Sequence, residues 1–138
     1  MAVRVRLKVE RGEVRVEVVA LVNSGYEADT PQLMVPIDVA RRLGLWPPPE
    51  DAREEVFDTA GGPIRVWVVR GAAEAEVVTP EGVRSNRVRV DIVVSPLAVE
   101  PLISDVLASE LGIAIEDPGR GLWRFRWAPM EAARPSER

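Results

Sequence analysis

Ala20-Leu21-Val22-Asn23-Ser24-Gly25-Tyr26 is the stretch of sequence that decides the fold. Before it, Val14, Val16 and Val18 alternate with charged residues, which predicts a half-buried strand that becomes apolar on both faces towards its end. Asparagine, serine and glycine all favour turns, so the strand is expected to end in a tight loop that emerges from the core. Taken alone, these three polar residues are most simply a turn without chemical function.

The rest of the chain is predicted to be mostly β. Apolar and charged residues alternate between turn residues, which predicts strands at 3–9, 13–22, 33–36, 55–59, 64–69, 72–79, 87–94, 113–116 and 122–127. Two short helices are expected at 37–43 and 102–111, because each segment is followed by a glycine that can end a helix. This pattern predicts a closed or nearly closed β-barrel in one domain, residues 1–128, followed by a flexible polar C-terminal tail at 129–138.

Cysteine and histidine are both absent from the chain. Their absence excludes thiol catalysis, disulfides, serine–histidine relays and metal sites built from thiolate or imidazole. Any acid–base chemistry would therefore depend on carboxylates. The acid-rich stretch 50–55 lacks the ligand spacing of a calcium loop, so we expect neither a metal ion nor a cofactor.

Charge and hydropathy narrow the expected partners and location. The formal net charge is −4 and the sequence pI is near 5.0, which gives no overall attraction to nucleic acid. No apolar run approaches the roughly 20 residues of a membrane-spanning helix, and the N-terminus alternates charge with valine, unlike a signal peptide. We therefore expect a cytoplasmic protein without nucleic-acid or membrane partners. The arginine-rich, cysteine-free composition fits a thermophilic source, although a GC-rich genome produces the same bias.

Several motifs follow one another in an order that resembles a known family. After the stretch 20–26 come Leu33-Met34-Val35-Pro36 and then Leu43-Gly44-Leu45; further on lie Ala60-Gly61-Gly62 and Pro101-Leu102-Ile103-Ser104-Asp105. Together they resemble the small, single-domain retropepsin-like aspartic proteases of bacteria and archaea. In that family an apolar strand delivers Asp-Thr/Ser-Gly, a strand and short helix follow, a glycine-rich flap hairpin covers the substrate, and a second apolar motif reads Leu-Leu/Ile-Gly. Here Ser104 stands in the glycine position of the second motif.

The resemblance implies the acid protease fold, a retropepsin-like closed β-barrel, and a homodimer in which each chain supplies one residue to a shared catalytic site. Two aspartates in such a site share one proton. Asn23 occupies the aspartate position, and its amide has no titrating proton to share, whereas Ser24 and Gly25 fit the supporting roles. The expected function is thus that of a non-proteolytic homodimer that binds an extended peptide or a protein partner in the cleft between subunits, with Ala60, Gly61 and Gly62 in the flap.

Two other functions remain open from the sequence. The chain is an active aspartic peptidase if Asn23 deamidates to aspartate, or if a displaced acid such as Asp29 reaches the catalytic position. It is a purely structural interaction barrel if the cleft is closed. The non-proteolytic homodimer is the leading prediction, and these two functions are its alternatives.

The last predicted strand carries three aromatic residues at alternating positions, Trp123, Phe125 and Trp127. Alternate residues of a strand share one face. We therefore expect these side chains to pack in the core or at a dimer interface rather than to form a ligand platform.

Overall fold

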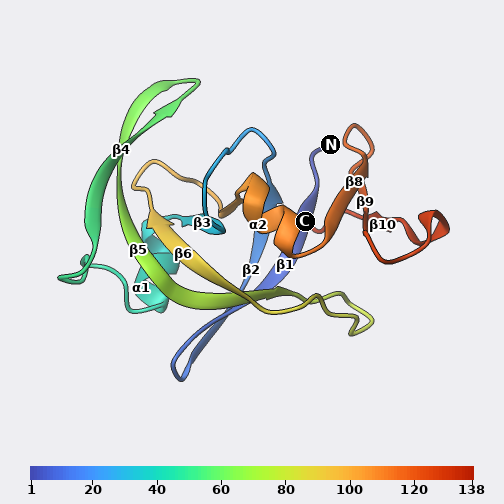
Figure 1. The fold of residues 1–138 in the computed structure, drawn as a ribbon, viewed down its shortest axis with the longest axis horizontal. Helices are drawn as coiled ribbons and strands as arrows, with labels where there is room; N and C mark the ends of the chain where they lie inside the picture. Colours follow the sequence, from blue (N-terminus) through green and yellow to red (C-terminus); the bar gives the residue numbers. More distant parts are fainter.

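The computed structural model describes residues 1–138, and strands account for most of the regular structure (Figure 1). β1 (Arg4–Arg11) and β2 (Val14–Val22) form the predicted first hairpin, which turns at Gly12 with a φ of 60°. The apolar residues of β1 are buried and alternate with more exposed charged residues. The alternation in the sequence therefore determines which face of the hairpin packs in the core.

Six strands close into a barrel. The members that follow the first hairpin are β3 (Gln32–Val35), β5 (Gly62–Val77), β6 (Val88–Val94) and β7 (Leu102–Ile103). The strands neighbour one another in the order β1-β2-β7-β3-β6-β5, and pairing between β1 and β5 closes the ring. The prediction of a mostly β fold with a closed barrel and two short helices is confirmed.

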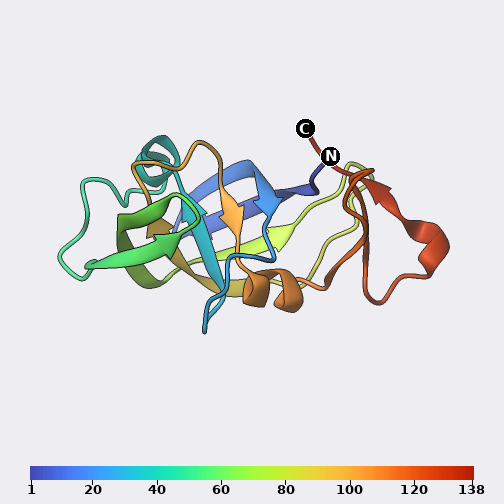
Figure 2. The same cartoon turned by 90° about the horizontal axis from the view of Figure 1, so that it is seen from above.

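One strand lies outside the ring. β4 (Arg53–Thr59) pairs only with the first part of β5 and is the last strand in the sheet order, so its outer edge has no partner. Together the two strands form a hairpin, the β4–β5 hairpin, that extends beyond the barrel and turns at Ala60 and Gly61 (Figures 1 and 2). An unpaired strand edge offers backbone donors and acceptors to another extended chain.

The prediction of two separate strands at 64–69 and 72–79 was wrong, because residues 62–77 form the single strand β5. Gly71 has a φ of 57°, and the register with β6 shifts between Val69 and Ala73. Such a bulge bends a strand without ending it. The bend allows β5 to pair with β4 at one end and with β1 at the other.

The second helix is shorter than predicted. Its expected first residues form β7, and α2 (Asp105–Glu110) begins after Ser104. The first helix, α1 (Ile37–Arg42), is close to its predicted range and is followed by Gly44 with a φ of 73°. Neither helix has the length and apolar character that a membrane crossing requires.

A second, smaller sheet follows α2. It consists of β8 (Ile113–Asp117), β9 (Leu122–Phe125) and β10 (Arg134–Pro135), and a single 3₁₀ turn at Met130–Ala132 precedes β10. The segment 129–138, expected to be a loose tail, thus contains a strand that pairs with β9. The Glu137 N–H also donates to the Arg4 carbonyl at 2.8 Å, which places both termini close together (Figures 1 and 2).

The aromatic residues near β9 differ in their environments. Trp123 and Phe125 are 3% and 1% exposed and belong to the same apolar core as the barrel strands. Trp127 lies after the end of β9, stacks on Phe125 with a centroid distance of 4.4 Å and is 58% exposed. Core packing is therefore confirmed for the first two aromatic residues, and Trp127 remains at the surface.

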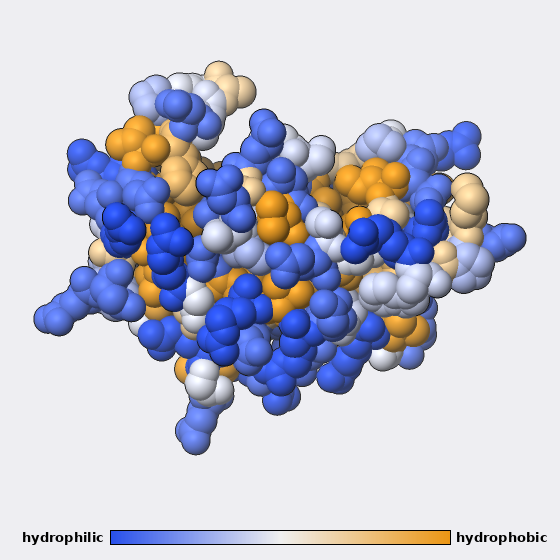
Figure 3. Space-filling model, in the orientation of Figure 1, coloured by the Kyte–Doolittle hydropathy of each residue, from blue (hydrophilic) through white to orange (hydrophobic).

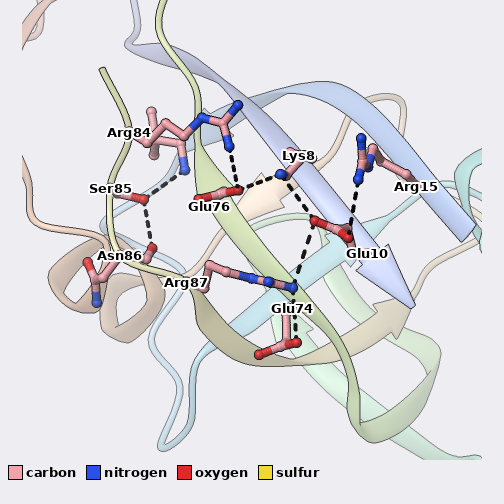
Figure 4. Close-up of polar contacts among 10 residues, drawn as sticks. Lys8, Glu10, Arg15, Glu74, Glu76, Arg84, Ser85, Asn86 and Arg87 are labelled. Carbon is pink, nitrogen blue, oxygen red and sulfur yellow. Dashed lines mark hydrogen bonds and ion pairs between the residues drawn. The ribbon is translucent and has the colours of Figure 1, made fainter. Parts of the chain in front are cut away.

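An ion-pair network supports the closure of the ring (Figure 4). Lys8 of β1 lies opposite Glu76 of β5 in the strand register, and the Lys8 Nζ is 2.7 Å from the Glu76 carboxylate and 3.2 Å from that of Glu10. The Lys8 and Glu76 side chains are 13% and 7% exposed. Breaking so buried a pair leaves an unpaired charge, so these two residues favour the β1–β5 register over others. Arg84 and Arg87 extend the network outward.

Candidate functional site

The polar loop after β2 is held in a defined turn. The Asn23 side-chain carbonyl, Oδ1, accepts a hydrogen bond from the Gly25 N–H at 3.1 Å, and the Asn23 main-chain carbonyl accepts one from Tyr26 at 3.0 Å. A Cβ on Gly25 would lie 3.3 Å from the Asn23 Oδ1, so glycine allows this close turn. The Asn23 N–H in turn donates to the Ile103 carbonyl at 3.1 Å. The asparagine is therefore fixed at the end of β2 and half-buried.

The second apolar motif, Leu102-Ile103-Ser104, supports this loop through β7 and the residue that follows it. β7 is inserted between β2 and β3, parallel to the first and antiparallel to the second. Ser104 follows β7 and is fully buried, and its Oγ accepts hydrogen bonds from the Gln32 N–H at 3.1 Å and from the Leu107 N–H at 3.2 Å. One hydroxyl thus caps α2 and ties the helix to β3.

Asp105 connects α2 to the loop itself. Its Oδ1 accepts from the Ala28 N–H at 3.0 Å, and its own N–H donates to the Tyr26 carbonyl at 2.9 Å. These bonds satisfy the Ala28 N–H and the Tyr26 carbonyl, which have no hydrogen-bond partner in a strand. The loop from Asn23 to Thr30, the Asn23 loop, is consequently attached to the barrel at both the strand and the helix.

Tyr26 links the Asn23 loop to the β4–β5 hairpin. Its hydroxyl donates to the Gln32 Oε1 at 2.7 Å, and its ring meets Phe57 of β4 edge-to-face at 6.4 Å. Burial, with a smaller effect from the Asp91 charge, raises the pKa of Tyr26 above its ordinary value. The phenol is therefore protonated at neutral pH and acts as a donor, not as a base.

The tip of the hairpin is a tight turn. Thr59 pairs with Gly62, its Oγ1 donates to the Gly62 carbonyl at 2.6 Å, and the same Oγ1 accepts from the Gly61 N–H at 3.2 Å. Gly62 has a φ of 107°, a conformation that side chains with a Cβ disfavour. These contacts hold the turn at Ala60 and Gly61 in a defined conformation.

A cavity of about 650 Å³ lies between the hairpin and the Asn23 loop. The hairpin supplies the wall on one side, through Phe57, Asp58, Thr59, Ala60, Gly61 and Ile64. The opposite side consists of the Asn23 loop with Met34, Ser95, Leu97, Ala98 and Leu102. The space-filling view shows the hairpin arching over this hollow, with apolar side chains gathered beside it (Figure 3). The cavity is therefore mainly apolar, and Asn23 is one of the residues that line it.

The structure brings most of the predicted site residues to this cavity. Asn23, Gly25, Ala60, Gly61 and Leu102 all line it. Ile103 and Ser104 are fully buried beneath and do not line it. Ser24 does not line it and instead lines a separate cavity of about 510 Å³ next to α2. Gly62 does not line the cavity either and instead shapes the hairpin tip.

Several contributors to the cavity were not singled out from the sequence, among them Phe57 and the segment 95–98. Phe57 was expected only as part of a strand, and the segment 95–98 follows β6 as a loop with no periodic pattern. Ser95 is almost fully buried and accepts from the Leu97 N–H at 3.3 Å, which shapes this wall. No sequence pattern predicts such a wall, because it forms where a loop folds back towards a hairpin that is distant in the sequence.

The cavity lacks the groups that hydrolysis by paired carboxylates requires. Asp58, on the hairpin, is its sole carboxylate. Asp29 lines a different cavity, so it does not stand in for Asn23 in this arrangement. An aspartic protease needs two carboxylates about 3 Å apart. Within one chain the site can accept backbone hydrogen bonds and apolar side chains, but it has no carboxylate pair to activate water.

No model of a known protein family matches the chain, and a search of curated proteins finds no match either.

Proposed function

We propose that this chain is a retropepsin-like homodimer that binds an extended peptide segment in the cavity under the β4–β5 hairpin and does not cleave it. The observation that carries the proposal is the cavity itself, because Asn23 and the glycine-containing hairpin tip both line it. Binding requires a groove and backbone partners, whereas hydrolysis requires the missing carboxylates.

The unpaired edge of β4 supports strand addition as the mode of binding. β4 is the last strand of its sheet, and its residues 57–59 line the cavity. A peptide that pairs with this edge gains main-chain hydrogen bonds, and its alternate side chains enter the apolar pocket. Backbone pairing explains how such a site could accept many sequences, while Met34, Ile64 and Leu97 favour an apolar side chain.

The exposed Asn23 loop supports association of two copies. Ser24 and Gly25 are exposed at its apex, although the strand that leads to them is buried. In the proposed dimer the two Asn23 loops meet at the two-fold axis, and each asparagine occupies the place of one catalytic aspartate. The Ser24 hydroxyl is then available to the partner copy.

Peptide binding is tested with the wild-type chain and one pair of matched variants. Fluorescence anisotropy of labelled unfolded peptides is measured against wild type, Ala98→Phe and Ala114→Phe. The first variant fills the cavity, whereas Ala114 is similarly half-buried on β8 and lines no part of it. We expect Ala98→Phe to weaken binding at least about 10-fold and Ala114→Phe to leave it unchanged. No binding by wild type, or equal loss in both variants, contradicts the proposal.

Assembly and chemistry are tested separately. Sedimentation equilibrium is expected to give twice the 15.2 kDa chain mass. Wild type incubated with an unfolded protein at acidic and neutral pH is expected to leave it intact, whereas Asn23→Asp is expected to cleave it in a pepstatin-sensitive manner. A monomeric mass would remove the shared site, and pepstatin-sensitive cleavage by wild type would show an active peptidase instead.

A further inference from the structure

A second cavity, of about 500 Å³, adjoins the one under the hairpin. The two cavities share Tyr26, Phe57 and Asp58 in their walls. The second lies between the Asn23 loop and the β4–β5 hairpin, and Val68 and Arg70 of β5 and Asp91 of β6 also line it. The shared walls make the two cavities compartments of one groove, so an extended segment long enough to leave the first compartment enters the second.

The two compartments differ in charge. The first contains one carboxylate and several apolar side chains. The second is lined by five carboxylates, Glu27, Asp29, Glu55, Asp58 and Asp91, and by one arginine, Arg70. None of the six charged side chains forms an ion pair within the chain. The second compartment therefore presents an excess of uncompensated negative charge.

Asp91 is the member of this group whose position points most directly to a ligand. It is only 9% exposed, and its carboxylate accepts hydrogen bonds from the Thr30 hydroxyl at 2.7 Å and from the Gly71 N–H at 2.8 Å. These donors are neutral, and no cation of the chain lies within ion-pair distance. A carboxylate so deeply buried is costly without an opposite charge. A cation entering the compartment would supply that charge.

We propose that the bound segment carries a lysine or arginine adjacent, or next but one, to a large apolar residue, so that the apolar side chain fills the first compartment and the basic one fills the second. This inference rests on the proposed peptide binding and specifies its ligand. The carboxylates come from the Asn23 loop, β4 and β6, and they do not converge as a group able to hold a metal ion. A long, flexible ammonium or guanidinium group suits charges spread in this way.

The test uses synthetic peptides that differ at a single position. Three acetylated, amidated peptides with the same apolar residue carry lysine, norleucine or glutamate at the neighbouring position, and a second set moves that residue one place further. Binding is measured by isothermal titration at low and high salt. We expect the better lysine peptide to bind about 10-fold more tightly than its norleucine counterpart, with the preference falling at high salt.

Matched variants locate the effect. The double variant Asp29→Asn with Glu55→Gln removes two charges of the second compartment, and Glu54→Gln removes a neighbouring charge that pairs with Arg65 and lines neither cavity. We expect the double variant to reduce the lysine preference to less than about 3-fold, and Glu54→Gln to retain it. Thermal melts check that each variant is folded.

Each outcome has a separate meaning. If no peptide binds, both the proposed function and this inference are wrong. If all three peptides bind equally, or if glutamate is preferred, the inference is overturned while peptide binding stands. A lysine preference that persists in the double variant also overturns the inference, because the lysine would then be recognised outside the second compartment.

Discussion

Replacing Ser104 with alanine is expected to destabilise the fold through the loss of one buried hydroxyl. The Ser104 Oγ accepts from two backbone N–H groups, those of Gln32 and Leu107. Loss of the helix cap costs about 1 kcal/mol, and an unsatisfied N–H beside β3 adds about 1–3 kcal/mol. The free energy of unfolding should therefore fall by about 2–4 kcal/mol, which lowers Tm by about 10 °C for a domain of this size.

Urea denaturation followed by tryptophan fluorescence measures this change. Ser109→Ala is the matched control, because Ser109 lies on the same helix, is exposed, and forms hydrogen bonds with Gly112 and Arg126 through its main-chain carbonyl and not through its hydroxyl. The control should stay within about 0.5 kcal/mol of wild type. A Ser104→Ala loss no larger than that of the control would refute the view that this hydroxyl joins the helix to the strand. Reduced peptide binding by Ser104→Ala would further show that the cap supports the Asn23 loop.

Three further predictions concern pH, the hairpin tip and Asn23. A hydrogen bond from Arg4 lowers the pKa of Glu100 below its ordinary value of 4.5, so this carboxylate contributes stability above that pH and loses it as the pH falls through its lower folded value. Arg4→Met should therefore flatten the decline of the urea midpoint below about pH 4.5. Gly62→Ala, at a φ of 107°, should speed amide exchange in the hairpin about 5- to 30-fold, whereas Gly61→Ala, without a positive φ, should change it little. In the folded chain, intact mass after prolonged warming should show no gain of about 1 Da from deamidation of Asn23, because its Oδ1 is held by the Gly25 N–H. In the chain unfolded in urea, the same measurement should show this gain.

Local patterns predicted the parts of the fold that depend on neighbouring residues. The alternation along 3–9 and 13–22 predicted the first hairpin, because burial of one face imposes a period of two on a strand. Gly44 predicted the end of the first helix, because glycine readily adopts the left-handed conformation that ends a helix, and the structure shows it there. The same reasoning failed at residues 102–103, where an apolar pair was assigned to a helix and instead pairs with β2 and β3. Pairing with distant strands overrides local preference at that point.

The candidate site was predictable only in part. The sequence pointed to Asn23, Gly25, Gly61 and Leu102 through motifs whose order resembles one family, and these residues line one cavity. It did not predict the loop wall at 95–98 or the acidic compartment. Asp91 belongs to an ordinary strand pattern, and its burial without an ion pair becomes apparent only when β6 lies beside the Asn23 loop.

The sequence by itself determined the strand-rich composition, the buried faces, the turns at glycines and the amide at position 23, because each follows from the chemistry of a few consecutive residues. The tertiary structure decided the closure of the ring through β1 and β5, the insertion of β7 between β2 and β3, and the groove beneath the hairpin. These features join residues far apart in the chain, such as Asn23 with Gly61 and Thr30 with Asp91. Their free energy comes from long-range pairing and packing, which no short window of sequence contains.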